Sequence, residues 1–370
     1  MRIFEITAAE ARELPAPAAC LAAGAPAAGY YLWLSLTRSE LRESTAEVQQ
    51  ALQRLAGTQL VDLHVSDLLN DQLPSHYDAT SQYDVLVIRR LAAGAAAPAE
   101  PALRGAGPPA LRRIDTRPVG FVVFDRLLLS VHPEDGEVRD AVAARLGAPA
   151  VQGPALDVRA TSARLPTSPA DLMLRVVNQI VDGYLALRRD LTRQLDHWQA
   201  ELIDPKTRFS NWGALMQSRQ ALHHLDEICE DQRGAVQDWL DALEALPAPA
   251  SPAALREREL LLVRSRDVLE HIERVAHHVR RLEQNAETAV QLHFSVQSHR
   301  TNDIMRVLTA LTAVFLPLNL IAGIFGMNFE FIPLVHKADG FWIAMGSMLL
   351  IAIALTAIFW RKRYLARTAR

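Results

Sequence analysis

The sequence predicts an α/β domain, followed by a long α-helical stalk and two transmembrane helices. Residues 307–325 and 341–360 are uncharged apolar runs, each close to the ~20 residues that a helix needs to cross about 30 Å of hydrocarbon. Upstream, runs rich in β-branched and aromatic residues give way near residue 168 to apolar residues at three- and four-residue spacing. That change of period is typical of a passage from strands to amphipathic helices.

Residues 1–165 are predicted to form the α/β domain. Runs with the composition of strands are residues 30–36, 83–91 and 118–131. Helical patterns occupy residues 40–57 and 137–147. The Ala/Pro/Gly-rich stretch 92–110 is predicted to be a long hairpin loop.

Residues 166–250 are predicted to form a helical hairpin, because Pro205 in "IDPKTRFSN" cannot continue a helix. Residues 251–325 are predicted to be a stalk helix that continues into the membrane at about 307–325. Such a helix would be on the order of 100 Å long and would couple a soluble domain rigidly to a span. The alternative is a separate stalk and membrane helix with a kink near 298–302. The stalk helix carries an apolar seam that steps by four and three, as in a coiled coil, at Val268, Ile272, Val275, Val279, Leu282, Ala286 and Ala289.

Charge predicts the orientation of the two spans. Residues 326–340 form the loop between them and have Lys337 as their one firm positive charge, whereas residues 361–370 form a basic tail without acids. The positive-inside rule therefore places the loop outside and both termini in the cytoplasm. We expect an inner (plasma) membrane protein whose two spans contact lipid.

Composition and motifs exclude several function classes. The net charge of −3 without a concentrated basic face argues against nucleic acid as a partner. The sequence has no GxxxxGK[ST] motif for ATP and no recognisable nucleophile–base constellation. We therefore expect neither an enzyme nor a bound prosthetic group.

One face of the first span carries polar residues, and we call this face the polar stripe. Its members step by three and four and are Asn302, Met305, Thr309, Thr312, Leu316, Asn319 and Gly323, with Leu308 at its border. Polar side chains at membrane depth usually face protein or water. The residues alone leave two interpretations open: the lining of a pore, which needs an oligomer, or packing between helices.

The first span ends in Gly326, Met327 and Asn328. Gly326 would permit a sharp exit from the helix, because glycine tolerates positive φ. A ring of Asn328 amide oxygens, one per subunit, could hydrogen-bond the first-shell water of a dication that keeps its waters, such as Mg²⁺. Glu330 and Asp339 could raise the local cation concentration. The alternative interpretation is an ordinary helix C-cap.

The stretch "TNDIMRVLTALTAVFLPLNLIAGIFGMNFEFIP" (301–333) resembles the CorA family of two-span divalent metal-ion transporters, whose hallmark is Gly-Met-Asn after the first span. The resemblance implies a CorA-like funnel, a homopentamer whose first spans line a central pore. It implies a selectivity motif at Gly326, Met327 and Asn328, a hydrophobic gate at Met305 and Leu308, and a basic ring at Arg361, Lys362 and Arg363. Phe325 departs from the family, which more often has Tyr before the motif.

The resemblance implies uptake of a divalent cation driven by the membrane potential, most readily Mg²⁺, with Co²⁺ and Ni²⁺ as further candidates. It also implies that cytoplasmic metal closes the channel, so that Mg²⁺ is both substrate and regulator. Candidate regulatory acids are Asp226, Glu227, Glu230 and Asp231 in "LDEICED". Two alternatives stay open: a Zn²⁺ transporter of the ZntB branch, proton-coupled or not, and a non-conducting membrane-anchored sensor or scaffold.

Overall fold

The computed structural model describes residues 1–14, 29–92, 114–147, 165–203, 212–247, 249, 251–327 and 338–362. The chain divides into two compact units, one of Met1–Glu201 with Arg208–Glu287 and one of Leu202–Thr207 with Thr288–Arg370. The α/β segment and most of the helical hairpin fall in the first unit. The domain boundaries drawn from the sequence stay predictions.

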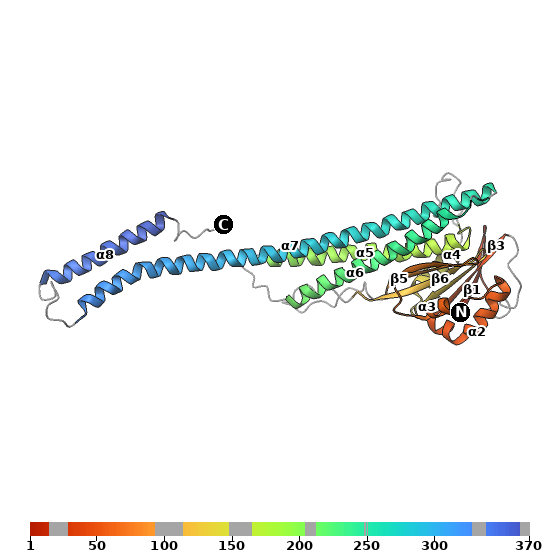
Figure 1. Cartoon of the computed structure of the whole chain (residues 1–370), viewed down its shortest axis with the longest axis horizontal. Helices are drawn as coiled ribbons and strands as arrows, with labels where there is room; N and C mark the ends of the chain where they lie inside the picture. The colour runs from red at the N-terminus through yellow and green to blue at the C-terminus, as the bar shows by residue number, and fades with distance from the viewer. Residues whose placement is uncertain are drawn as a thin grey trace. The chain divides into compact units, whose positions relative to one another are not determined.

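A seven-stranded sheet forms the centre of the first unit (Figure 1). Its strands are β1 (Arg2–Thr7), β2 (Ala11–Glu13), β3 (Tyr30–Thr37), β4 (His76–Ala79), β5 (Asp84–Leu91), β6 (Thr116–Val123) and β7 (Leu127–His132). The order is β2-β1-β3-β7-β6-β5-β4, and β3 pairs with β7 in parallel while the other neighbours are antiparallel. The register places Ser35 beside Ser130.

Helices cover both faces of this sheet, because its strands alternate apolar side chains toward two separate cores. One core joins Leu34, Val87 and Val122 of the sheet to helices α2 (Arg38–Leu55) and α3 (Asp62–Leu69). The other core joins the opposite face of the sheet to α4 (Glu137–Gly147), α5 (Pro169–Ile203), α6 (Trp212–Ala245) and the first part of α7 (Pro252–Phe325). The first unit is therefore a helix–sheet–helix sandwich.

The start of α2 shows how the sequence sets an element boundary. Thr37 accepts a hydrogen bond from the backbone N–H of Glu40, and the Glu40 side chain accepts one from the backbone N–H of Thr37. This capping box satisfies two donors that the first turn leaves open. The helix begins at Arg38, two residues before the start expected from the apolar pattern.

The helical part agrees closely with the sequence pattern. α7 is one helix of 74 residues from Pro252 to Phe325, so no break separates a stalk from a membrane helix near residues 298–302. Pro317 lies inside it and leaves the carbonyl of Ala313 without its helical donor, a defect that membrane helices tolerate. The seam residues Val268, Ile272, Val275, Val279, Leu282 and Ala286 are buried in the same core as α5 and α6.

The stretch 118–131 is not the single strand that its apolar run suggested. β6 ends at Val123 and β7 begins at Leu127, and the turn is closed by a hydrogen bond of 2.9 Å from Phe124 N to Leu127 O. Asp125 and Arg126 lie in this turn and are exposed. A long apolar run therefore folds into a hairpin that supplies two central strands of the sheet.

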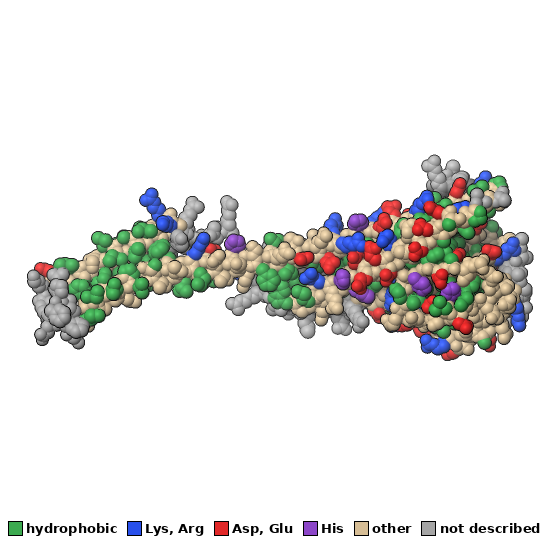
Figure 2. All heavy atoms as spheres, in the orientation of Figure 1, with side chains coloured by type: hydrophobic (Ala, Val, Ile, Leu, Met, Phe, Trp, Pro, Cys, Tyr) green, Lys and Arg blue, Asp and Glu red, His purple; other side chains and the backbone are tan. Residues whose placement is uncertain are grey.

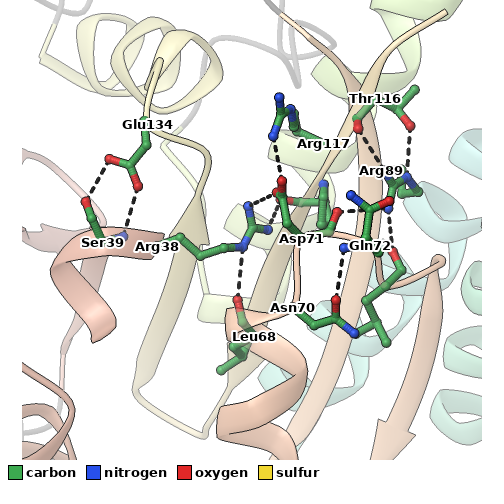
Figure 3. Close-up of polar contacts among 12 residues, drawn as sticks. Arg38, Ser39, Leu68, Asn70, Asp71, Gln72, Arg89, Thr116, Arg117 and Glu134 are labelled. Atoms are coloured by element: carbon green, nitrogen blue, oxygen red, sulfur yellow. Dashed lines mark hydrogen bonds and ion pairs between the residues drawn. The ribbon is translucent and has the colours of Figure 1, made fainter. Parts of the chain in front are cut away.

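An arginine cluster holds the loop after α3 against the sheet (Figure 3). Arg38 is almost fully buried, and it donates to the Asp71 carboxylate at 3.0 Å and to the carbonyl of Leu68 at 3.2 Å. Arg117 donates to the other Asp71 oxygen at 2.5 Å. Arg89 donates to the carbonyls of Leu73 and Thr116, each at 2.7 Å. We interpret the cluster as structural, because these guanidinium groups are committed to protein acceptors.

Candidate ion-conduction site

Among the described residues, two helices are long and apolar enough to cross a membrane, α7 through its C-terminal part and α8 (Ala338–Arg361). Figure 2 shows hydrophobic side chains spread over α8 and the adjoining end of α7. Leu316, Leu320 and Leu350 each expose about two thirds of their surface. So much contiguous apolar surface is unfavourable in water and indicates contact with lipid or with other chains.

Burial in the second unit follows one face of each membrane helix. Ala310 of α7 is only 1% exposed, and the positions on the same face are half-buried, namely Ala313, Val314, Pro317, Leu318, Ile321 and Phe325. In α8 the half-buried positions are Ala344, Ser347, Met348, Ile351, Ala352, Leu355 and Phe359. An isolated helix cannot bury a side chain in this way, so we infer that these two faces pack against each other.

The polar stripe lies on the opposite face of α7. Asn319 is nine residues from Ala310, which is about two and a half helical turns and therefore the other side of the helix. Every member of the stripe is exposed in the single chain, that is Asn302, Met305, Leu308, Thr309, Thr312, Leu316, Asn319 and Gly323. The stripe is thus not packing between the two membrane helices of one chain.

Two threonines of the stripe are hydrogen-bonded within α7. Thr309 donates its hydroxyl to the carbonyl of Met305 at 2.7 Å, and Thr312 donates to the carbonyl of Leu308 at 2.9 Å. Such bonds to the preceding turn let Thr lie in an apolar helix without an unsatisfied donor. The oxygen lone pairs stay available on the exposed face.

Only the beginning of the Gly-Met-Asn motif lies in the described residues. Gly326 donates its N–H to the carbonyl of Ala322 at 2.9 Å, and Met327 donates to that of Ile324 at 3.3 Å. The expectation that Gly326 uses a positive φ is wrong. Among the described glycines, a positive φ is found at Gly29, Gly57 and Gly136 but not at Gly326.

Another property of Gly326 explains the requirement for glycine. A Cβ at this position would lie 3.0 Å from the carbonyl oxygen of Ala322, which is closer than normal packing allows. A side chain at this position would therefore require the last turn of the span to shift by a few tenths of an ångström. Asn328, Glu330 and Arg363 lie outside the described residues, whereas Arg361 and Lys362 are exposed at the end of α8.

The four candidate regulatory acids of α6 differ in their surroundings. Arg280 of α7 places Nε at 2.9 and 3.1 Å from the two carboxylate oxygens of Asp226, and it also pairs with Glu230. Arg233 donates to Glu230 at 3.0 Å. Asp226 and Glu230 are thus neutralised by arginines of the same chain.

Glu227 and Asp231 have no such arginine partner among the described contacts. Glu227 is exposed and lies 3.7 Å from His223 and 3.4 Å from His224. Burial raises the pKa of Asp231, and the negative charge of Glu227 raises it further. Within the part of the chain that the structure describes, no group of three or more His, Cys, Asp or Glu residues is arranged to hold a metal ion.

A sequence model of the family described as "CorA-like Mg2+ transporter protein" matches residues 35–363, which is most of the chain. The chain belongs to this family. Together with the two candidate spans, this membership identifies a membrane protein, and a family of transporters agrees with the expectation that the chain is not an enzyme.

Curated relatives match over shorter stretches. The cobalt/magnesium transport protein CorA of Thermotoga maritima is 24% identical over 256 residues, which cover 69% of this chain and 66% of that protein. The magnesium transport protein CorA of Haemophilus influenzae (strain ATCC 51907 / DSM 11121 / KW20 / Rd) is 32% identical over 104 residues, which cover 28% of this chain and 33% of that protein. The matches thus span just under two thirds of the first relative and one third of the second.

Solved structures show the same fold over the full length. The complete structure of the CorA magnesium transporter from Methanocaldococcus jannaschii has a TM-score of 0.67 at 16% identity, with 98% of each chain covered. The full-length CmaX protein has a TM-score of 0.64 at 17% identity, with 98% of this chain and 97% of that chain covered. The predicted order of an α/β domain, a long helix and two membrane helices is therefore confirmed.

Proposed function

We propose that this chain is one subunit of a homopentameric channel that carries divalent cations, Mg²⁺ first, into the cytoplasm. The observation that supports the proposal is the polar stripe, which faces away from α8 and is exposed in the single chain. One helix cannot enclose a pore, so the stripe needs further copies of α7 around an axis. The number five comes from the resemblance to CorA.

The chemistry of the stripe supports a hydrated, hard dication. It offers amide and hydroxyl oxygens from Asn302, Thr309, Thr312 and Asn319, and oxygen ligands suit Mg²⁺, which gives up its waters reluctantly. It contains neither His nor Cys, the ligands that Zn²⁺ favours. The relatives named above are called magnesium or cobalt/magnesium transport proteins, and we accordingly propose Co²⁺ as a second substrate.

The driving force in this proposal is the membrane potential across the inner membrane, with both termini in the cytoplasm. A dication that enters down an inside-negative potential gains about 4.6 kcal/mol per 100 mV, from roughly 2.3 kcal/mol for each charge. That energy supports about a thousandfold accumulation at equilibrium. No chemical energy source is then required, but an open pore would overload the cell.

Closure by cytoplasmic metal is the regulatory part of the proposal. Carboxylates shared between neighbouring subunits would bind Mg²⁺ and favour the closed ring, which shifts the population without any other ligand. Glu227 and Asp231 are the better candidates among the four acids of α6, because Asp226 and Glu230 are already paired with arginines. Asp231 also carries a pKa raised by burial and by the Glu227 charge, which a bound dication would relieve.

The test is ion flux into proteoliposomes that contain the full chain and a Mg²⁺-sensitive dye, under an inside-negative potential. The variant is Asn328→Ala, and the matched control is Asn285→Ala, at an exposed position of α7 outside the predicted membrane part. Mg²⁺ entry that follows the voltage, falls at least about tenfold in Asn328→Ala and persists in the control is the expected result.

Two other outcomes would favour the alternatives. Zn²⁺ entry that follows a pH gradient, with little Mg²⁺ entry, would assign the protein to zinc transport. No flux of either ion from an assembled oligomer would support a non-conducting sensor or scaffold. Cross-linking in the membrane, read as a ladder of five bands, tests the pentamer independently of transport.

A further inference from the structure

The hydroxyl groups of Thr309 and Thr312 differ from free hydroxyls in one respect. A free hydroxyl can donate one hydrogen bond and accept two. Here each donor is already used within α7, at 2.7 Å to Met305 O and at 2.9 Å to Leu308 O. What these two side chains offer to the open face of the helix is therefore acceptor capacity alone.

Their position makes this property relevant to conduction. Both residues are exposed. Around the helix, Thr312 lies about 160° from the buried Ala310 and Thr309 about 100° from it. They are three positions apart along the helix, a rise of about 4.5 Å, so that in an oligomer they would form two adjacent layers. Along the stripe they lie between the apolar side chains of Leu308 and Leu316.

An acceptor-only surface distinguishes the hydration shells of cations and anions. Water bound to a cation through its oxygen turns its hydrogens outward, and these hydrogens need acceptors. Water bound to an anion through a hydrogen turns its lone pairs outward, and these need donors. The amide of Asn319 offers both kinds of group and cannot make this distinction, whereas hydroxyls with occupied donors can.

We propose that Thr309 and Thr312 form an acceptor collar that passes hydrated divalent cations and rejects anions without any fixed charge. This inference rests on the proposed channel function and adds a basis for charge selectivity inside the membrane. The two oxygens also interrupt an otherwise apolar stretch from Met305 to Leu316, which is about 16 Å long. A stretch of that kind without polar groups would lose its water and stop conducting.

The test replaces both hydroxyls by methyl groups of the same shape. Thr309→Val with Thr312→Val removes the collar, and Thr309→Ser with Thr312→Ser keeps the hydroxyls. The matched control is Thr356→Val at an exposed position of α8. Each full-length protein is checked for assembly by size-exclusion chromatography, and the single variant Thr312→Val is measured as well in case the double variant does not assemble. The readouts are Mg²⁺ flux into proteoliposomes and the reversal potential in a MgCl₂ gradient.

We expect the double valine variant to lose at least about tenfold in Mg²⁺ flux, the double serine variant to stay within about threefold of wild type and Thr356→Val to stay within about twofold. Residual current in the valine variants should shift its reversal potential toward that of Cl⁻. A double or single valine variant with wild-type flux and an unchanged reversal potential would overturn the collar alone. A wild-type protein without any ion flux would overturn the channel proposal and the collar with it.

Discussion

Arg280 on α7 lies 2.9 Å from one carboxylate oxygen of Asp226 on α6 and 3.1 Å from the other. The same guanidinium pairs with Glu230. An arginine therefore occupies the place that a regulatory cation would need between these two acids. The acidic sequence "LDEICED" resembles a metal site only when α6 is considered without Arg280 of α7.

Asp226→Asn with Glu230→Gln should leave closure by internal Mg²⁺ nearly unchanged, because both carboxylates are committed to arginines. Glu227→Gln with Asp231→Asn should raise the half-inhibiting Mg²⁺ concentration several-fold, by about fivefold if the two acids hold one shared ion. Flux into proteoliposomes of graded internal Mg²⁺ measures both. The opposite ranking of the two pairs would place the sensor at Asp226 and Glu230.

Asp71→Asn should destabilise the first unit by about 2 kcal/mol, because it leaves the buried Arg38 without its carboxylate. The exposure of Asp71, whose side chain is 39% accessible, keeps the effect below that of a fully buried pair. Asp115→Asn is the matched control, since Asp115 lies 3.8 Å from Arg117 and is more exposed; it should cost less than about 0.5 kcal/mol. Urea unfolding of the purified protein compares the two, and equal losses would show that Asp71 is no more than a surface acid.

Glu134→Gln should lower stability near neutral pH and have little effect in acid. The backbone N–H of Ser39 and its hydroxyl donate to Glu134 at 2.9 and 2.8 Å, and these bonds lower the pKa of the carboxyl. A lowered folded-state pKa contributes stability above the unfolded value of about 4.3, and that contribution is lost as pH falls through the folded pKa. We expect a difference of about 0.5 kcal/mol at pH 7.

Thermal unfolding of wild type and Glu134→Gln at about pH 7 and about pH 3 measures this difference. Glu43→Gln on the exposed face of α2 serves as the control and should shift neither transition. A difference that grows on acidification would mean that the Ser39–Glu134 contact favours the protonated acid, contrary to the sign argued here.

Gly326→Ala should weaken the end of the first span by about 1 kcal/mol, because its methyl group would meet the Ala322 carbonyl at 3.0 Å. Gly346→Ala in α8 meets nothing within 4 Å and should be neutral or slightly stabilising. Melting temperatures in detergent compare the two variants. If Gly326→Ala melts at or above Gly346→Ala, crowding is not the reason for glycine at this position.

The sequence predicted periodic features well and tertiary features poorly. The three- and four-residue steps of the seam from Val268 to Ala286 and of the polar stripe are helical geometry, which the chain carries locally. The hairpin at 118–131 was missed because Asp125 and Arg126 are the only polar pair between two apolar runs. The strand at Arg2–Thr7 was missed because the residues that flank it contain no Gly or Pro turn signal.

Within the site, the sequence could indicate which residues share a face but not what covers that face. Which face of α7 the second membrane helix covers is a tertiary feature, and the burial of Ala310 indicates that face only in the folded chain. The reason for Gly326 could not be read from the sequence either, because a positive φ and a close carbonyl both favour glycine, although the Ala322 carbonyl is only four residues away. The pairing of Asp226 and Glu230 with Arg280 could not be predicted, because Arg280 is fifty residues or more away along the chain.

One carbonyl in the first unit has a mechanical consequence. The carbonyl of Arg89 on β5 accepts from Tyr184 of α5 at 2.8 Å and from Gln232 of α6 at 2.6 Å, so both of its lone pairs are used. A slide of either helix by a single residue, about 1.5 Å, would break one of these bonds beside a buried tyrosine. The two helices and the strand are thereby held in fixed register. A conformational change that passes through this unit therefore has to move α5, α6 and β5 together as a rigid body.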